Sequence, residues 1–339
     1  MPIPLTIVMY HYVRPLEASR YPRLKAMDLE RFRGQLDYIQ RHYQVVSMEQ
    51  VIAASRGERD VLPAHPLLLT FDDGYRDHHD HVLPLLSQRS MQGSFFPPAC
   101  AVLERRVLDV NKIQFILASV EDPGVLVDCI FSAMDEARAH YGLEPNHVYF
   151  SRLSSDSRYD DPPTTFVKRA LQRELPEDFR QQLTEGLFSQ YVTSDEKAFA
   201  EELYMSEGQL RHLLEAGMFI GSHGDQHYWL NSLDHAHQVK EVDRGLRFLE
   251  ALGAYRDDWV MCYPYGGYDD SLLSILRARG CALGLTTEVA LADLTVNDPL
   301  TLPRIDTNDL PTDVEAPTPM GFEGRGRERL SAAGSKETS

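Results

Sequence analysis

The sequence is poor in cysteine, in basic residues and in long apolar runs, and each shortage excludes a class of protein. Its four cysteines form no Cys-x-x-Cys pair and indicate no disulfide framework. Lysine and arginine total 34 against 51 aspartates and glutamates, so the net charge of −17 opposes binding to nucleic acids and anionic membrane surfaces. No apolar run approaches the roughly 18 residues of a membrane-spanning helix.

We expect no secretion signal, because Met1-Pro2-Ile3-Pro4 leads directly into a strand-like segment without a basic region. Together with the free thiols, this predicts a cytoplasmic protein. At 339 residues, with 43% hydrophobic and 25% charged residues, the chain can form one large globular domain or two ordinary ones.

The most informative segment is LLLTFDDG at residues 67–74. An apolar run without polar alternation predicts a strand buried on both faces, as in a parallel sheet. The run ends at Asp72 and Asp73, where a glycine then turns the chain. Carboxylates at this end of a parallel strand lie where α/β proteins place their chemistry, although a simple strand-to-helix cap would also explain them.

Strands and helices alternate on both sides of a long helical block, which predicts an α/β fold of parallel strands with outer helices. Strands are expected near 5–10, 67–71, 94–96, 218–221, 259–263 and 281–286, with helices near 28–42, 82–86, 206–217, 239–249 and 272–276. Ser47 with Gln50 and Ser206 with Gln209 resemble the capping boxes that begin helices, and residues 302–306 close the ordered part.

The helical block at residues 105–204 has almost no strand pattern, and we expect a helical insertion there with a polar loop at 151–164. It is a candidate lid, a candidate surface for homo-oligomers, or a structural appendage. Residues 1–104 and 205–310 are expected to form one discontinuous domain. Residues 311–339 have the composition of a disordered tail.

Polar clusters follow several of the predicted strands. They contain His11, the two aspartates, His223 with His227, and Pro264 with Tyr265. In a parallel barrel these strand ends meet at one mouth. Two histidines and one aspartate from this set can hold a metal ion with a position left open for water, while the second aspartate accepts a proton from that water.

Three motifs in this order, TFDDG at 70–74, SHGDQH at 222–227 and YPYG at 263–266, resemble the polysaccharide deacetylase family, also called the NodB-homology domain or carbohydrate esterase family 4. The resemblance covers residues 1–104 and 205–310. It implies a distorted (β/α) barrel and a hydrolase that removes an N-acyl group, expected to be acetyl, from an amino sugar.

The resemblance also implies roles for individual residues. Asp72 would be the general base, and Asp73, His223 and His227 would bind one divalent ion. Zinc is the expected ion, with cobalt, nickel or manganese as alternatives. The backbone amide of Tyr265, which follows Pro264, would help to hold the oxyanion.

The sequence departs from the family pattern at Cys262, where members of the family often have an arginine that pairs with the base. Arg304 is our candidate for that partner. Cys262 itself is either a soft metal ligand or, as we favour, a buried strand cysteine. The histidines at 78–81, together with His235 and His237, are expected on solvated helix faces.

The usual family acid is a histidine near the end of the domain, but no histidine follows His237. His11 is the candidate replacement, because the first and last strands of a closed barrel are neighbours. It also resembles the amino-terminal Tyr-His segment of the exopolysaccharide deacetylase branch. The alternative is a buried histidine bonded to a backbone carbonyl.

We expect a cytoplasmic substrate, a soluble, nucleotide-linked or lipid-linked acylated amino sugar. Two other classes stay open. One is a deformylase or cyclic-imide hydrolase with the same metal site, and the other is an inactive carbohydrate-binding homologue.

Overall fold

The computed structural model describes residues 4–155, 160–254 and 257–317, which divide into two compact units. Of these residues, unit 1 contains those in 4–15, 26–105 and 201–317, and unit 2 contains those in 16–25 and 106–200. Residues 16–25, which the sequence predicts in the barrel domain, belong to unit 2 in the structure.

Unit 1 combines short strands with longer helices. Its strands are β1 (Pro4–Tyr10), β2 (Val13–Arg14), β3 (Met27–Asp28), β4 (Gln44–Val45), β5 (Pro66–Asp72), β6 (Gly93–Phe96), β7 (Phe219–Ile220), β8 (Val260–Cys262), β9 (Leu283–Leu285), β10 (Ala292–Asp293) and β11 (Ile305–Asp306). Its helices are α1 (Leu29–His42), α2 (Met48–Ser55), α3 (Leu83–Gln88), α4 (Ala99–Leu103), α11 (Glu207–Glu215), α12 (His235–Leu252) and α13 (Asp270–Ala278). The α/β class predicted from the sequence is confirmed.

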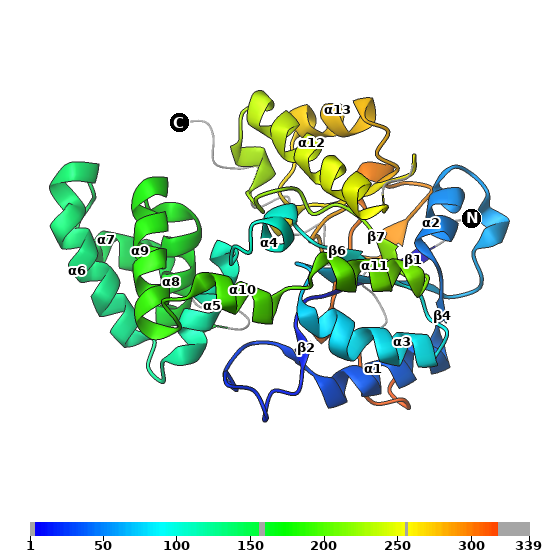
Figure 1. The fold of residues 1–339 in the computed structure, drawn as a ribbon, viewed down its shortest axis with the longest axis horizontal. Coiled ribbons are helices and arrows are strands. Elements are labelled where there is room, and N and C mark those ends of the chain that lie inside the picture. Colours follow the sequence, from blue (N-terminus) through cyan, green and yellow to red (C-terminus); the bar gives the residue numbers. More distant parts are fainter. Residues whose placement is uncertain (1–3, 156–159, 255–256, 318–339) are drawn as a thin grey trace. The chain divides into compact units, whose positions relative to one another are not determined.

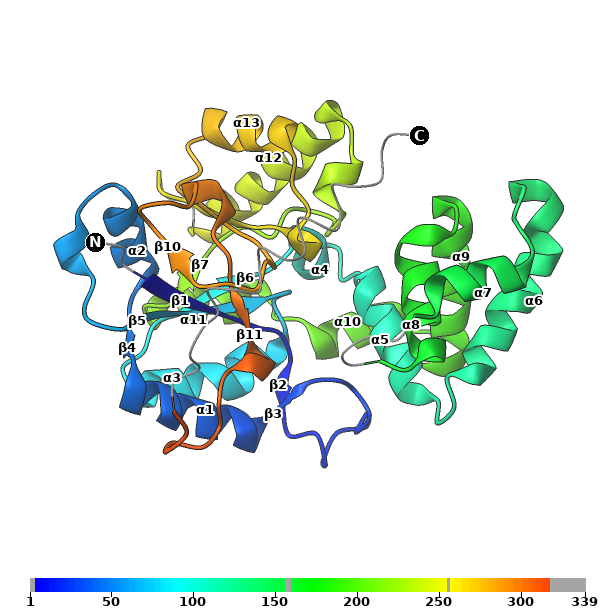
Figure 2. The same ribbon diagram turned by 180° about the vertical axis from the view of Figure 1, so that it is seen from behind.

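The strand pairings run in one direction around unit 1 and return to their starting point. β1 pairs in parallel with β5, β5 with β6, and β6 with β7. Ser222, just after β7, bridges to Met261 of β8, which pairs with β9. Leu285 of β9 bridges to Leu302, and β11 then pairs with β1 (Figure 2). The parallel pairings thus form a closed circuit, so their carboxyl ends lie at one mouth.

One apolar cluster lies inside this circuit and contains residues of β1, β5, β6, β7, β8 and β9. It includes Leu5, Ile7, Leu68, Phe96, Phe219, Val260, Cys262, Leu283, Leu285 and Leu302. Alternate strand residues such as Val8, Leu69 and Phe71 instead pack in a second cluster with side chains of the outer helices. Because successive strand residues face opposite sides, Asp72 continues the inner face of Leu68 and Thr70. β5 is buried along its whole length, as predicted.

Helices α1 and α3 lie on one side of the strands, and α12 and α13 lie on the other (Figure 1). The two predicted capping boxes are present: Ser47 with Gln50 begins α2, and Ser206 with Gln209 begins α11. These reciprocal side-chain bonds satisfy backbone groups that the first helical turn leaves open.

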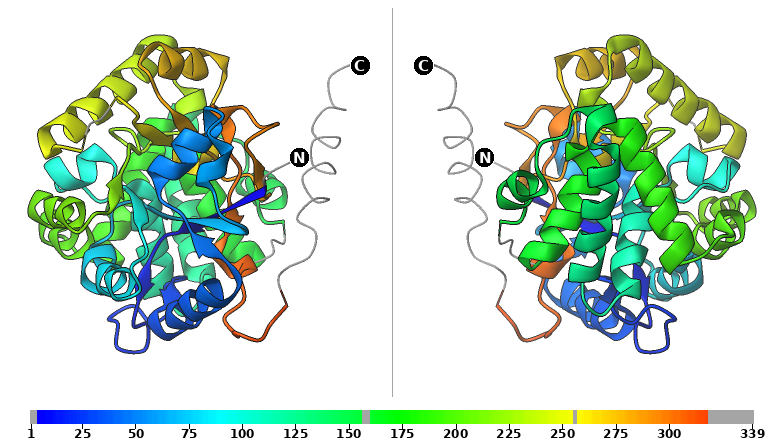
Figure 3. Two further views of the ribbon diagram at one scale, coloured as in Figure 1. Left: turned by 90° about the vertical axis from the view of Figure 1, so that its right-hand side faces the viewer. Right: turned by 90° about the vertical axis from the view of Figure 1, so that its left-hand side faces the viewer.

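In the described part of unit 2, residues 106–200 form a group of helices and residues 16–25 form turns (Figure 3). Its helices are α5 (Asp109–Ser119), α6 (Gly124–Tyr141), α7 (Asn146–Leu153), α8 (Pro162–Arg169) and α9 (Glu177–Tyr191), followed by α10 (Glu196–Leu203), which contains the boundary with unit 1. The loop predicted at 151–164 is too long, because α7 continues to Leu153 and α8 begins at Pro162. Proline suits the first helical turn, where its missing N–H has no partner in any case.

The predicted disordered tail is wrong for residues 311–317, which lie against α1. His42 Nε2 donates to the Val314 carbonyl at 2.7 Å, and Ala316 packs against the outer cluster. The rest of the predicted tail, residues 318–339, lies outside the described residues. In the described part of the chain, no helix combines the length and the apolar character that crossing a membrane requires.

Candidate active site

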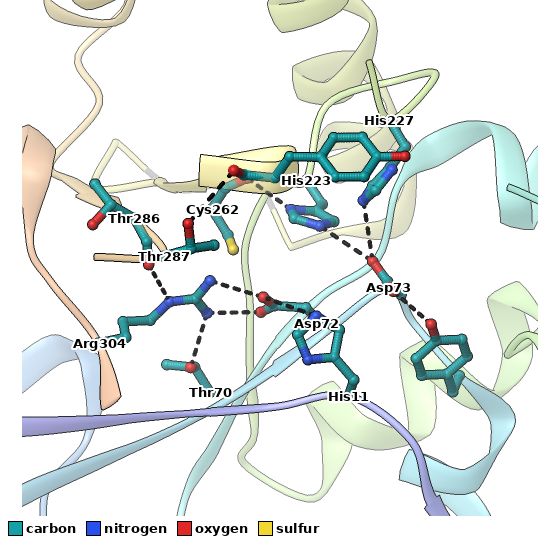
Figure 4. Close-up of polar contacts among 12 residues, drawn as sticks. His11, Thr70, Asp72, Asp73, His223, His227, Cys262, Thr286, Thr287 and Arg304 are labelled. Atoms are coloured by element: carbon teal, nitrogen blue, oxygen red, sulfur yellow. Dashed lines mark hydrogen bonds and ion pairs between the residues drawn. The ribbon is translucent and has the colours of Figure 1, made fainter. Parts of the chain in front are cut away.

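The two adjacent aspartates point in different directions because the backbone turns between them. Asp72 ends β5, whereas Asp73 and Gly74 both have left-handed backbones, with φ of 70° and 69°. Aspartate tolerates this region better than most residues, and glycine adopts it freely. A Cβ at Gly74 would also lie 2.7 Å from the Pro97 Cβ. The Asp-Asp-Gly sequence therefore sends two carboxylates toward different partners (Figure 4).

Asp72 faces Arg304, which comes from the segment before β11. The guanidinium donates to both carboxylate oxygens, at 2.9 and 2.8 Å. It also donates to the Thr286 carbonyl at 2.8 Å and to Thr70 Oγ1 at 3.1 Å. The Arg304 side chain is 0% exposed and that of Asp72 is 2% exposed. A bidentate pair of this kind fixes both the position and the orientation of the carboxylate.

The pairing also fixes the ionisation of Asp72. Burial by itself raises the pKa of this carboxyl, but the adjacent Arg304 charge and its hydrogen bonds outweigh burial and lower the pKa to about 2. The same pair raises the pKa of Arg304 above its usual value, despite burial. Asp72 is therefore a carboxylate at every physiological pH.

Asp73 faces two histidines instead of an arginine. Its Oδ1 lies 3.3 Å from His223 Nε2 and 3.3 Å from His227 Nε2 (Figure 4). Its other oxygen accepts a hydrogen bond from the Tyr75 hydroxyl at 2.5 Å. All three side chains of this Asp-His-His set are buried, and their ligand atoms lie within 4.8 Å of one another.

The chemistry of these atoms fits a divalent cation. His223 Nδ1 lies 2.7 Å from the Cys262 carbonyl, and since a carbonyl only accepts, this nitrogen carries the proton. Nε2 is then the ring nitrogen that faces Asp73 Oδ1, an oxygen without a hydrogen-bond partner among the described residues. Although burial lowers the pKa of His223, the neighbouring Cys262 and Asp73 raise it well above the usual value, so this gap between Nε2 and the carboxylate favours a positive species, either a proton or a metal ion. Asp73, His223 and His227 are therefore suited to bind a metal ion.

The remaining predicted residues lie around this centre. His11 follows β1, and its Nε2 is 3.9 Å from Asp72 Oδ2, with 43% of the side chain exposed. Pro264 is buried and begins the turn after β8. Tyr265 and His227 have left-handed backbones, with φ of 56° and 59°. Such conformations are uncommon outside glycine and cluster at functional sites.

Cys262 lies between the His223 ring and the Asp72–Arg304 pair (Figure 4). It ends β8, and its buried thiol shares a set of neighbouring ligand atoms with Asp72 and His223. Burial raises the pKa of this thiol. Both alternatives from the sequence are therefore compatible with its place, since it is a buried strand cysteine that also lies within reach of metal ligands.

Sequence reasoning missed several neighbours of the site. Tyr75 follows the Asp-Asp-Gly turn directly, and Trp229 stacks on the Tyr265 ring with centroids 4.6 Å apart. Both lie within two residues of a predicted site residue, but sequence proximity does not show where a side chain points. The expected solvated face at 78–81 is wrong for His78, which is fully buried and donates to the His11 carbonyl at 2.8 Å.

The fold and the site define a class, an α/β protein whose polar centre lies where parallel strands end. Within that class, residues 159–284 match the sequence model of the polysaccharide deacetylase family. This span contains His223, His227 and Tyr265. The comparison thus confirms the resemblance that the three motifs indicated.

Similar proteins agree with this family. YxkH of Bacillus subtilis (strain 168), which carries a provisional polysaccharide deacetylase name, is 25% identical over 96 residues, 28% of this chain. The match spans about one third (34%) of that relative's length.

Solved structures of similar fold include the deacetylase PplD from Streptococcus pyogenes in complex with acetate, at 17% identity and a TM-score of 0.55, with 90% of this chain and 93% of that chain covered. IcaB from Ammonifex degensii is similar at 19% identity and a TM-score of 0.55, with 91% and 94% covered. At these identities the likeness shows the fold alone.

Proposed function

We propose that this protein is a metal-dependent hydrolase that removes an N-acyl group, expected to be acetyl, from an amino sugar. The observation that carries the proposal is that two neighbouring buried carboxylates have different partners. Asp72 is held by a fixed arginine charge, and Asp73 faces two imidazole nitrogens. A base and a metal ligand need these two different surroundings.

Asp73, His223 and His227 would hold the divalent ion, for which zinc is the proposed identity. Such an ion, when bound, polarises the amide carbonyl and lowers the pKa of water. Arg304 aligns Asp72 so that this carboxylate accepts a proton from the attacking water. The backbone amide of Tyr265 donates a hydrogen bond to the oxygen where negative charge develops.

His11 is proposed as the acid that protonates the departing nitrogen. An amine anion is too poor a leaving group to depart without a proton, and a histidine can donate one near neutral pH. The His11 ring lies beside Asp72 and is partly exposed at the mouth. It therefore occupies the rim of the site, where a substrate would approach, rather than the closed core.

The proposed substrate is a soluble, nucleotide-linked or lipid-linked acylated amino sugar in the cytoplasm. The cysteine pattern supports a reducing compartment, because the four cysteines form no Cys-x-x-Cys pair and indicate no disulfide framework. Self-association through unit 2 is a separate proposal, and the mass of the full chain in solution tests it.

The deciding experiment measures acyl release from soluble amino sugars, sugar nucleotides and polymer, with and without added zinc. We expect acetate release from a soluble substrate that depends on the metal and is lost in Asp72→Asn. Formate release or ring opening would favour the related amide hydrolases. Activity on polymer alone would overturn the proposed substrate class, and a protein inert with zinc, cobalt and nickel would overturn the hydrolase.

A further inference from the structure

The thiol of Cys262 is buried inside the strand circuit, yet it lies beside the two polar halves of the site. It belongs to the inner apolar cluster and is 0% exposed. Its sulfur, a carboxylate oxygen of Asp72 and a ring nitrogen of His223 all lie within 4.8 Å of one another. Figure 4 shows the sulfur between the His223 ring and the Asp72–Arg304 pair.

We propose that Asp72, His223 and Cys262 form a second metal-binding set, which takes soft divalent ions such as cadmium, and zinc in excess. This set is distinct from Asp73, His223 and His227, because it contains a sulfur ligand. Thiolate ligands favour softer ions, whereas a carboxylate with two imidazoles accepts a wider range of divalent ions.

The two sets compete because they share one imidazole, that of His223. His223 Nδ1 donates to the Cys262 carbonyl at 2.7 Å, so Nε2 is the nitrogen that remains for a metal. An imidazole nitrogen has one lone pair and binds one ion. An ion held by Cys262 and Asp72 therefore takes His223 away from Asp73 and His227.

Binding at the second set changes the proton balance in a defined way. The sulfur–metal bond forms as the S–H bond breaks, the nitrogen–metal bond displaces any proton on His223 Nε2, and the released protons pass to the buffer. No oxidant or reductant takes part. Asp72 needs no such step, since Arg304 already holds it as a carboxylate.

This placement predicts inhibition, a consequence that rests on the proposed function. An ion on Asp72 occupies the carboxylate that would accept a proton, and the same ion removes a ligand from the first set. Cadmium is then an inhibitor rather than a substitute for the working metal, and Cys262→Ser should be less sensitive to it.

The test titrates the metal-free full chain with cadmium and records thiolate-to-cadmium charge-transfer absorption together with proton release. We expect absorption from one thiolate per chain. Cys262→Ser should lose it and bind cadmium at least about 100-fold more weakly, since even groups outside the ligand shell change affinity by about 10- to 100-fold. Cys281→Ser is the matched control and should keep the absorption, because its thiol donates to the Leu283 carbonyl outside this set.

Two further variants identify the ligand set. His227→Ala should keep the cadmium–thiolate absorption, whereas Asp72→Asn should weaken it. The proposal is overturned if the wild type shows no thiolate absorption, if Cys262→Ser retains it, or if His227→Ala loses it while Asp72→Asn does not. These readouts require no substrate, so failure of the second set is distinguishable from failure of the proposed hydrolase.

Discussion

The two halves of the site balance a buried negative charge in opposite ways. In the arginine half, Asp72 is neutralised within the chain by a guanidinium that donates to both of its oxygens. In the histidine half, Asp73 faces two imidazole nitrogens and the Tyr75 hydroxyl. The charge of Asp72 is therefore balanced within the chain, whereas Asp73 belongs to a set of side chains that is suited to hold a cation. Residues of one type, adjacent in the chain, thus acquire different chemistry from their partners.

The strongest test of this comparison replaces one side chain of either half at a time. Asp73→Ala and His227→Ala should lose the divalent ion and all measurable hydrolysis, because each removes a ligand. Asp72→Asn should keep the ion and lose about 10²- to 10⁴-fold in turnover, the usual contribution of a general base. Metal analysis of the purified variants, paired with turnover numbers, checks both halves.

Full metal occupancy in His227→Ala would refute the histidine half as the metal site. Loss of the ion in Asp72→Asn would mean that the two aspartates have been assigned the wrong way round. Asp234→Asn is a suitable control, since this exposed carboxylate caps α12 away from the site.

The second prediction concerns the rim of the arginine half. His11→Gln should retain the fold and the metal, reduce turnover by about 10²- to 10⁴-fold, and remove the basic limb of the pH–rate profile, because the protonated imidazole is the proposed acid. Turnover close to that of the wild type, or an unchanged basic limb, would show that the proton comes from another group. His235→Gln, at an exposed helix start, is the matched control.

The third prediction removes the internal cation from the arginine half. Arg304→Gln should lower the free energy of unfolding by about 3–5 kcal/mol, because an unpaired charge is left buried. Without the guanidinium, burial becomes the main influence on the Asp72 carboxyl. Its pKa should therefore rise from about 2 to above the usual range for aspartate. The fraction of ionised base, and with it kcat/KM, should fall at acidic pH where the wild type is unaffected.

Denaturant unfolding and a pH–rate profile test this pair. Adding Asp72→Asn to Arg304→Gln should recover part of the lost stability, since the double variant no longer buries a lone carboxylate. Equal stability of Arg304→Gln and wild type would contradict the ion pair.

The smallest expected effect concerns the histidine half and the contribution of the Tyr75 hydroxyl to it. Tyr75→Phe keeps the ring that stacks on Tyr12 but removes the hydroxyl that bonds Asp73. Metal affinity should fall by about 10- to 100-fold, as when other groups that orient a ligand are lost. A competition titration with a chelator measures this. Tyr38→Phe, on α1, is the control, and an equal loss there would mean that the hydroxyl of Tyr75 has no special role.

Local sequence predicted much of the fold. The run at 67–71 contains no polar alternation, and β5 is buried along its length. The capping boxes at Ser47 and Ser206 begin helices where expected. These features depend on neighbours a few residues apart, which is why the chain alone determines them. Polar composition does not show packing against a helix, which is why the loop at 151–164 was predicted too long and the contact of residues 311–317 with α1 was missed.

The sequence by itself determined which residues stand at the strand ends, since strand periodicity and turn residues are local properties. Only the tertiary structure decided which of them meet. Arg304 reaches Asp72 across 232 positions of chain, and the ring of His223 is oriented by a carbonyl 39 positions away. The Cys262 sulfur likewise comes beside both through the closing of the strand circuit. Such pairings depend on which parallel strands become neighbours in the fold. The spacing of residues along the chain does not show this.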